Sequence, residues 1–487
     1  MDFLTSAVGL LLALILYHGI KTVTLRGKNL PLPPGPTPLP LIGNLHLLGD
    51  HPHKSLARLA NIHGPLMRLR LGFVNTVVVS SADVAKQVLQ KHDLAFSSRT
   101  VPNALHAQDH FKYSVVWLPA ASQWRTLRKV MNSNIFSASC LDANEHLRSR
   151  KVDELIAYCR TVGAVDVGSA AFRTTLNLLS NTIFSIDLTD PFSDSAKEFK
   201  QLVSGIMEEA GKPNLVDFFP FLARFDPQGI RRRMTVNFGK VIDLFSSLID
   251  QKMEKRKCRD QEETSDDVIN TLLDMMPQEI DRTHIERMCL DLFAAGTDTT
   301  SSTIEWAMAE ALRNPEIMKR TKAELEEVIG KGEIVREGDI SRLPYLQCMV
   351  KETLRLHPPV PFLIPRRVER DVEVMGHTVP KDSQVLVNVW AIGRDPGVWE
   401  EPLEFKPHRF MESEVDVRGR NFELIPFGAG RRICPGLPLA MRMVPVMLGS
   451  LLNSFEWKVE GEKVEMDEKF GITLEKAQSL RAVPIPL

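Results

Sequence analysis

The chain has 487 residues, with 60 Lys and Arg against 61 Asp and Glu and a formal net charge of -1 at pH 7. This balance removes the electrostatic argument for a nucleic-acid partner, while the length leaves room to bury a cofactor without fixing a domain count. The six cysteines lie far apart without a C-x-x-C pair, which is unlike a disulfide scaffold or a zinc site and indicates reduced thiols facing a cytosol.

An apolar run over Phe3–Ile20 is just long enough to cross a bilayer as a helix. Basic residues follow it, among them Lys21 and Arg26, and this bias predicts that the following side is cytoplasmic. A cleaved signal peptide is the alternative, but the chain begins with Asp2 instead of a basic segment. We therefore predict a transmembrane signal anchor over residues 1–20.

Residues 31–40 read PLPPGPTPLP, and prolines at this density exclude a helix or a central strand. We interpret residues 21–40 as a linker and stiff proline-rich hinge between the membrane span and a folded body over 41–487. A ligand for a proline-binding domain is the alternative.

Most of the folded body has helical periodicity. Short β-branched runs over Leu66–Val79 predict a small antiparallel sheet, after which Ser81 is expected to cap a helix beginning at Ala82. The charged stretch 251–267 is expected to be a solvated connection. The fold class is therefore mainly α with a small β part. The longer helices are expected over Glu145–Tyr158, Thr174–Phe184, Phe238–Arg256, Asp281–Ala311 and Pro315–Ile329.

Trp124 and Arg128 lie one turn apart on a predicted helix. Their indole N–H and guanidinium group are donors suited to a buried carboxylate. A tryptophan packed in the core beside a surface arginine is the alternative interpretation.

Small and polar residues interrupt a long apolar helix over residues 294–300. Ala295 and Gly296 remove bulk where a flat ligand could approach, and hydroxyl groups beside Asp298 could hold waters in a locally distorted turn. This pattern describes a proton relay, and a helix kink with solvent-facing threonines is the alternative.

Glu352 and Arg355 are spaced three residues apart on a predicted helix. Such a pair is ordinarily a surface contact worth roughly 0.2–0.5 kcal/mol.

A stretch rich in glycine and proline, Pro426–Gly436, frames a single cysteine, Cys434. Its three glycines, Gly428, Gly430 and Gly436, are expected to take positive φ and to let the backbone approach a bulky flat group.

Pro435 suits the first turn of a helix running through Leu439–Leu452. The Cys434 thiol would then lie at the positive end of a helix dipole and ionise easily. A thiolate in this position can be a redox centre, a nucleophile or a metal ligand, and a buried structural cysteine is the alternative.

The whole stretch is similar to the haem-ligand loop of the cytochrome P-450 family, F-x-x-G-x-R-x-C-x-G. Phe427, Gly430, Arg432, Cys434 and Gly436 fill its fixed positions. The resemblance, to plant microsomal members, implies a cytochrome P-450 fold with an N-terminal membrane anchor, in which Cys434 is the axial thiolate ligand of haem b.

Further motifs of this family match the chain. The W-x-x-x-R match implies that Trp124 and Arg128 hold a haem propionate, and the resemblance implies the same role for Arg99, Arg366 and Arg432. The A-G-x-D-T-T match implies that Thr299 steadies dioxygen and that Asp298 delivers protons.

The E-x-x-R match implies that Glu352 and Arg355 join Arg409 in a buried charge network behind the haem. Arg409 lies in a segment that usually reads P-E-R-F, where this chain has His408 in place of the glutamate. We interpret His408 as a surface substitution.

Within the family, LAFSSR at residues 94–99 and ELIPF at 423–427 resemble monoterpenol hydroxylases. The resemblance implies that the enzyme hydroxylates a monoterpene alcohol, geraniol, at its terminal allylic methyl (C8), using O2 and electrons that NADPH-cytochrome P-450 reductase delivers. It also implies a single-pass protein of the endoplasmic reticulum membrane with a cytosolic catalytic domain. The alternatives are a monooxygenase acting on diterpenes, flavonoids or xenobiotics, and a haem protein that does not activate O2. The resemblance places in the substrate pocket Phe111, Val116, Phe293, Ala295, Val360, Phe362 and Leu363.

Overall fold

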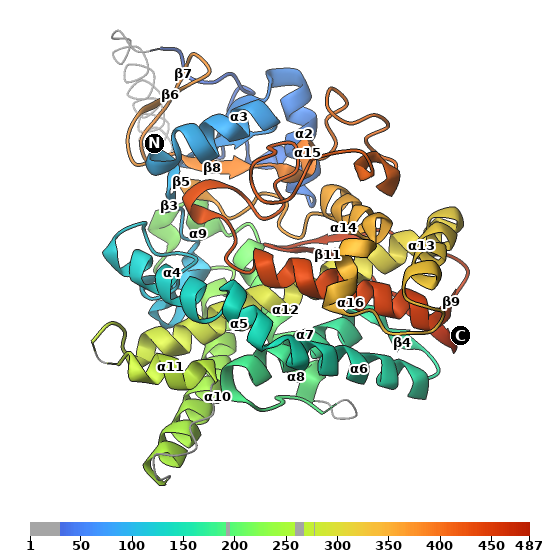
Figure 1. Cartoon of the computed structure of the whole chain (residues 1–487). Helices are drawn as coiled ribbons and strands as arrows, with labels where there is room; N and C mark the ends of the chain where they lie inside the picture. The colour runs from blue at the N-terminus through green and yellow to red at the C-terminus, as the bar shows by residue number, and fades with distance from the viewer. Residues whose placement is uncertain (1–29, 191–194, 259–266, 277) are drawn as a thin grey trace, which may run out of the picture.

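The computed structural model describes residues 30–190, 195–258, 267–276 and 278–487. The predicted anchor over residues 1–20, and the linker up to residue 29, lie outside the described residues. Figure 1 shows a mainly helical body with a smaller β part beside the N-terminal helices, which confirms the predicted fold class.

The α-helices are α2 (Pro52–His63), α3 (Ala82–Lys86), α4 (Ser122–Asn134), α5 (Ala138–Ala143), α6 (Glu145–Thr161), α7 (Val167–Phe184), α8 (Ser195–Gly211), α9 (Leu215–Phe218), α10 (Ile230–Cys258), α11 (Val268–Asp274), α12 (Arg282–Arg313), α13 (Pro315–Val328), α14 (Pro344–Leu356), α15 (Val389–Ile392) and α16 (Leu437–Ser454). The strands are β1 (Leu66–Leu71), β2 (Val74–Val79), β3 (Ser98–Arg99), β4 (Val165–Asp166), β5 (Arg366–Arg367), β6 (Val372–Val374), β7 (His377–Val379), β8 (Gln384–Val387), β9 (Phe455–Val459), β10 (Glu468–Phe470), β11 (Leu474–Lys476) and β12 (Arg481–Pro486).

The predicted helices are present, and two of them are longer than expected. The α7 helix begins at Val167 because the Asp166 side chain accepts a hydrogen bond from the Ser169 backbone N–H at 2.7 Å. The α10 helix continues to Cys258, so the prediction of a connection over 251–267 is wrong for its first part, although most of those residues are exposed. Residues 259–266 lie outside the described part of the chain.

The main sheet has the strand order β1-β2-β8-β5-β3, in which β2 and β8 are parallel and the other neighbours are antiparallel. The predicted antiparallel pair is confirmed, with Leu66 opposite Val79, and Ser81 caps α3 as expected. The register of β3 and β5 sets Arg99 directly opposite Arg366, so their side chains leave the same face of the sheet.

The proline-rich segment forms neither helix nor strand over residues 30–38, as predicted. It is nevertheless not a free spacer, because it lies along the β part. The Pro34 carbonyl accepts from the Arg68 backbone N–H at 2.7 Å, and the Pro31 carbonyl accepts from Thr378 at 2.9 Å. A side chain in place of Gly35 would collide with the Arg68 carbonyl oxygen.

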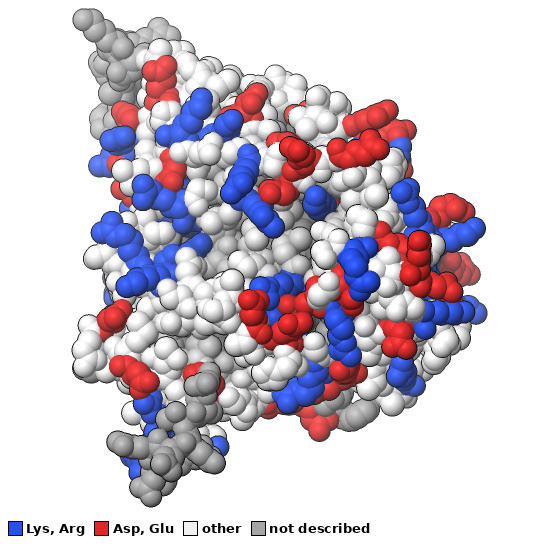
Figure 2. All heavy atoms as spheres, viewed as in Figure 1, with Lys and Arg blue, Asp and Glu red and all other residues white. Residues whose placement is uncertain are grey.

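Two long helices cross the interior. The α12 helix packs against α7, α10 and α16, and it starts at Asp281, whose side chain accepts from the His284 backbone N–H at 2.9 Å. Among the described residues, α16 is the one helix long and apolar enough to cross a membrane, but 67% of it is buried in the protein, as in a core helix. Figure 2 shows Lys and Arg interspersed with Asp and Glu over the face in front of α16.

Candidate functional site

The loop before α16 holds Cys434 in place through its own backbone. The Cys434 N–H donates to the Phe427 carbonyl at 2.9 Å. Gly428 and Gly430 have φ of 70° and 68°, as predicted, whereas Gly436 has φ of -79° and the prediction of positive φ there is wrong. A side-chain carbon at Gly436 would lie 3.8 Å from the Cys434 sulfur, which is an ordinary van der Waals distance, so packing against the sulfur does not require glycine there.

The helix start differs from the prediction. The α16 helix begins at Leu437 after the cap residue Gly436, and the proline in its first turn is Pro438, not Pro435. Burial raises the pKa of the Cys434 thiol, while the backbone N–H groups of Gly436 and Leu437 and the Arg128 guanidinium lower it by less. The predicted easy ionisation is therefore wrong for the polypeptide alone, although a metal cation at the sulfur would displace the proton.

Four arginines, Arg99, Arg128, Arg366 and Arg432, surround this loop and are called the arginine cradle below. Arg128 donates to the carbonyl of Ile433, one residue before the cysteine. Arg99 donates to the Val116 and Ile364 carbonyls at 3.2 and 2.7 Å, and Arg366 donates to Phe96 at 3.1 Å.

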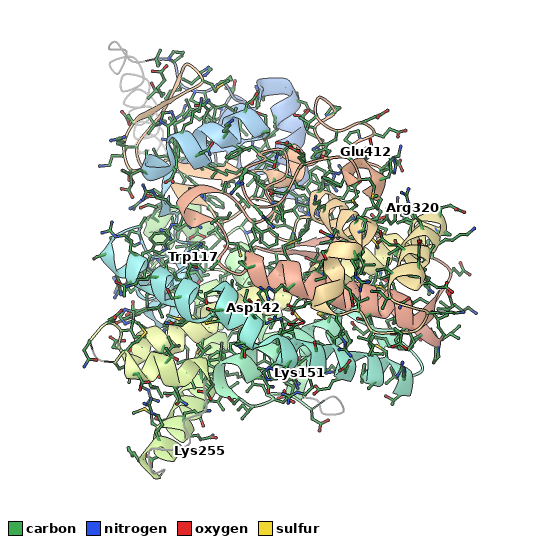
Figure 3. The ribbon with its side chains drawn as sticks, in the orientation of Figure 1. Trp117, Asp142, Lys151, Lys255, Arg320 and Glu412 are labelled. Atoms are coloured by element: carbon green, nitrogen blue, oxygen red, sulfur yellow. The ribbon has the colours of Figure 1, made fainter. Side chains whose placement is uncertain are left out.

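Arg432 reaches the same region from the cysteine loop. It donates to the carbonyls of Ser97 at 2.9 Å, Val115 at 3.3 Å and Leu118. Trp117, labelled in Figure 3 near α4, precedes Leu118 and marks this place in the molecule. The sequence pairs Trp124 with Arg128, whereas in the structure the Trp124 ring packs against Arg432. The Trp124 indole N–H donates to the Val115 carbonyl at 3.1 Å. The Arg432 guanidinium lies 4.5 Å from the centre of the Trp124 ring.

No member of the arginine cradle forms an ion pair with a carboxylate of the described residues, and each donates hydrogen bonds to carbonyls instead. An anion nearby is Asp93, which pairs with Arg431 and raises the pKa of Arg366 by less than burial lowers it. Burial is the main cause that lowers the pKa of Arg366 to about 10 and of Arg432 to about 9. Burial and the other three arginines lower the pKa of Arg99 well below its usual value. Cations buried without anions are costly. The cradle therefore fits a ligand with carboxylates beside the cysteine, as haem would be.

The helix α12 presents Thr299 and Asp298 without the predicted distortion. The segment is helical throughout, and the Thr299 hydroxyl donates to the Ala295 carbonyl at 2.7 Å, so the expected distorted turn is wrong. Ala295 is exposed although Ala294 and Thr297 beside it are buried, which indicates an open space against this side of the helix.

Asp298 is only 3% exposed, and its Oδ2 has no hydrogen-bond donor among the described residues. Burial raises the pKa of Asp298 well above its usual value, and the Glu475 carboxyl raises it further, against the Thr473 hydroxyl and Lys200. Burial and the neighbouring Glu475 carboxyl thus favour the protonated form of Asp298, and the sequence did not indicate this second acid.

The predicted pocket residues differ in their surroundings. Phe293 is fully buried and packs on Phe245 with ring centres 4.8 Å apart, so it supports the interior without lining accessible space. Phe362 packs edge-on against Phe470 at 6.0 Å. Leu363, with φ of 52°, lies beside Gly428 of the cysteine loop. The remaining ones are partly buried or exposed, namely Phe111, Val116, Ala295 and Val360.

The predicted charge network is formed. Glu352 and Arg355 have fully buried side chains joined by two hydrogen bonds of 2.7 and 2.8 Å, and Arg409 donates to Glu352 at 3.1 Å. His408 is exposed, as interpreted from the sequence. The surface-pair interpretation of Glu352 and Arg355 is therefore excluded.

One further acid was missed by sequence reasoning. Asp291 on α12 accepts from the Ser114 hydroxyl at 2.8 Å, from the Val115 backbone at 2.9 Å, and lies 3.1 Å from His110 Nε2. It thereby fixes the loop whose Val115 and Leu118 carbonyls receive Arg432. No local pattern reveals this contact, because the partners lie far apart in the sequence.

Comparison with known proteins supports the resemblance that the motifs indicate. Residues 33–480 match the family model described as "Cytochrome P450". Two enzymes named geraniol 8-hydroxylase, from Swertia mussotii and Catharanthus roseus, are each 66% identical over 100% of this chain and 99% and 100% of theirs. A 7-ethoxycoumarin O-deethylase from Helianthus tuberosus is 56% identical over the full length of both chains. The chain therefore belongs to the cytochrome P-450 family.

Proposed function

We propose that this protein hydroxylates geraniol at its terminal allylic methyl, C8, to give 8-hydroxygeraniol in monoterpenoid biosynthesis. The observation that carries the chemistry is the arginine cradle, a group of cations without ion-pair partners among the described residues, set around the cysteine loop. The substrate is supported by 66% identity over the full chain to two enzymes named geraniol 8-hydroxylase.

Enzymes of this family bind haem and use O2 with NADPH-derived electrons that a reductase delivers, so this protein is a monooxygenase acting on a small substrate. Bound haem would supply the oxidation of a C–H bond, which protein side chains cannot perform. The fit of the chain to haem rests on the arginine cradle, which would bind carboxylates, and on the Cys434 thiol beside it.

In this proposal the Cys434 thiolate would hold the haem iron. Gly430 and Gly436 would keep its loop close to the cofactor, and the Phe427 carbonyl holds the cysteine backbone. Arg99, Arg128, Arg366 and Arg432 would neutralise the propionates, with Trp124 fixing Arg432 by packing under its guanidinium group.

Thr299 and Asp298 then handle protons on α12. Asp298, whose surroundings favour its protonated form, is the internal donor, and the Thr299 hydroxyl passes the proton after releasing the Ala295 carbonyl. The space beside Ala295 receives the substrate, and Val360 and Leu363 exclude water from it. The buried set of Glu352, Arg355 and Arg409 fixes the segment 393–406, because Arg355 donates to the carbonyls of Gly393, Pro402 and Glu404.

The monooxygenase domain comprises residues 41–487, preceded by an anchor over 1–20 and the hinge over 21–40. We place the protein in the endoplasmic reticulum membrane, with its catalytic domain in the cytosol and NADPH-cytochrome P-450 reductase as its partner. An exposed apolar patch on the folded body supports its attachment to lipid. Phe73 and Phe221 pack edge-on at 6.1 Å and are 51% and 67% exposed. The patch, named here the apolar patch, consists of Leu41, Ile42, Phe73, Phe221 and Phe225.

A second candidate is oxidation of aromatic ethers or other xenobiotics. It is favoured by the 56% identity to an enzyme named 7-ethoxycoumarin O-deethylase. Apolar pockets distinguish related substrates weakly, by about 1–3 kcal/mol for a methylene group, so one pocket can serve both reactions.

The test is turnover in membranes that contain the full chain and its reductase, with geraniol and 7-ethoxycoumarin supplied separately and product masses recorded. We expect NADPH-dependent 8-hydroxygeraniol. The variant Cys434→His should form no product and should lose the thiolate-type Soret band of the reduced carbon-monoxide complex. A wild-type enzyme that converts the ether but not geraniol establishes the second candidate, and a thiolate-type band in Cys434→His excludes Cys434 as ligand.

A further inference from the structure

The hairpin of β10 and β11 connects several parts of the site. The Ser302 hydroxyl on α12 donates to the Leu474 carbonyl at 3.1 Å, and the Leu474 N–H donates to Pro359 at 2.7 Å. At the turn, the Ile472 N–H donates to the Met207 carbonyl of α8 at 3.2 Å. These bonds fix β11 against α12.

Because Ser302 lies one turn after Asp298 and bonds to Leu474, this packing places the next residue of β11, Glu475, near Asp298, and the Glu475 carboxyl raises the pKa of Asp298. The Asp298 carboxyl is buried, and its Oδ2 has no hydrogen-bond donor among the described residues. Two carboxylates cannot both be ionised at close range in a buried place, whereas one proton between them satisfies both. The other groups that face Asp298 are Thr473 and Lys200. Lys200 donates to the Ser169 hydroxyl at 2.9 Å, and its charge lowers the pKa of Asp298 by less than burial and Glu475 raise it.

Glu475 also faces outward. It is partly exposed and borders a recess of about 10 Å³, which is room for about one water molecule. Lys469, opposite Glu475 in the strand pair, is tied to Glu208 on α8 at 2.9 Å across this recess. The recess is lined by Ser204, Glu208, Lys469, Phe470, Gly471, Thr473 and Glu475.

We infer that Glu475 and Asp298 share one proton and form a relay that connects surface water with the Thr299 segment of α12. In each cycle the shared proton leaves from the Asp298 side towards Thr299, and a proton from water in the recess restores the pair at Glu475. One proton enters and one leaves, so the charge of the pair is unchanged. Glu475 acts through Asp298 and is a positioning residue. The inference deepens the proposed function and rests on it for the destination of the proton.

The first test is the infrared titration of the protonated carboxyl band of the full-chain, substrate-free holoenzyme. Asp298→Asn identifies the band of Asp298 by its loss. In Glu475→Gln the titration midpoint of that band should move to lower pH, because the neighbouring negative charge is removed. An unchanged midpoint overturns the shared proton. This readout needs no turnover, so it stays decisive even if geraniol is not the substrate.

The second test is the coupling of electrons to product. With geraniol, Glu475→Gln should keep the carbon-monoxide spectrum but give at least about tenfold less product per NADPH, with hydrogen peroxide in its place. Glu475→Asp should restore part of the product, and the exposed control Glu462→Gln should behave as wild type. Unchanged coupling in Glu475→Gln overturns the relay. If Glu475→Gln lowers the product per NADPH but leaves the infrared midpoint unchanged, the relay is overturned as well. Glu475 would then have only a structural role in the β10–β11 hairpin.

Discussion

Two arginines set opposite each other on neighbouring strands destabilise a sheet unless an anion lies between them. Arg99 and Arg366 are such a pair, and Arg432 adds a third cation to the same place. At the scale of the residue, these arginines repel one another in the protein without haem, and the carboxylates of bound haem would remove this repulsion. Neutralising one member should have opposite effects on the free and the cofactor-bound protein.

We predict this outcome for Arg366→Met. The apoprotein should unfold at the same or a higher temperature, whereas haem should dissociate at least about tenfold faster, which corresponds to about 1.4 kcal/mol of lost binding free energy. Thermal unfolding of the apoprotein and transfer of haem to an acceptor protein measure the two effects. Arg367→Met, at the exposed next position of the strand, is the matched control. Haem retention equal to wild type in Arg366→Met would exclude the propionate role.

Thr299 gives a second prediction at this scale. Thr299→Ala removes the hydroxyl but leaves nearly the same volume, so haem and geraniol should still bind and NADPH should still be consumed. Product per NADPH should fall while hydrogen peroxide rises. The control is Thr303→Ala. The Thr303 hydroxyl donates to the backbone carbonyl of Thr299, one turn earlier, at 2.8 Å, so this variant loses an equivalent hydrogen bond. Unchanged product yield in Thr299→Ala would return these threonines to a structural role.

At the scale of the element, α12 carries a second buried acid. Glu305 lies against Gly168 of α7 and accepts from the Leu480 N–H at 2.7 Å. Burial, partly opposed by that hydrogen bond, raises the pKa of Glu305 to about 7. The folded state therefore binds a proton more tightly than the unfolded chain, so stability is greatest below the unfolded pKa near 4.5 and decreases as pH rises to about 7.

Glu305→Gln should abolish this part of the pH dependence. Gln keeps the oxygen that accepts from Leu480, so we expect the variant to match wild type near pH 5 and to exceed it by about 1–3 kcal/mol at pH 8. Denaturant unfolding of the holoenzyme at the two pH values measures this. The exposed substitution Glu327→Gln on α13 controls for charge. A wild-type advantage at pH 8 would show that the ionised form of Glu305 is the stabilising one.

Some elements of the fold follow from local sequence patterns, whereas others depend on contacts between residues that are distant in the sequence. Local patterns locate the cysteine loop, the small residues of α12 and the Glu352–Arg355 pair, because each depends on neighbours within a few turns. The start of α16 was misplaced because either Pro435 or Pro438 suits a first turn, and the choice depends on the loop packing. The contact of Asp298 with Glu475 and the opposition of Arg99 and Arg366 depend on strand register, which single-sequence patterns do not specify.

At the scale of the whole molecule, the apolar patch gives the body a membrane contact of its own. Deleting residues 3–20 should leave haem binding intact and reduce, without abolishing, the fraction of protein that sediments with membranes. Adding Phe221→Ser and Phe225→Ser should release it further, by about tenfold or more, since burying one such ring is worth about 1.5–3 kcal/mol. Vesicle sedimentation measures both steps, with the exposed Val236→Ser as control. Equal sedimentation with and without the two serines would assign membrane contact to the anchor alone.

The arginine cradle draws its members from Arg99 to Arg432 and so sets an order of events during synthesis. At roughly 5–20 residues per second, the first cation leaves the ribosome on the order of tens of seconds before the cysteine. Through this interval Arg99 and Arg128 stay hydrated, because Ile364 and Ile433, whose carbonyls they bind in the finished protein, have not yet been synthesised. Closure of the interior around these arginines therefore belongs to the end of translation.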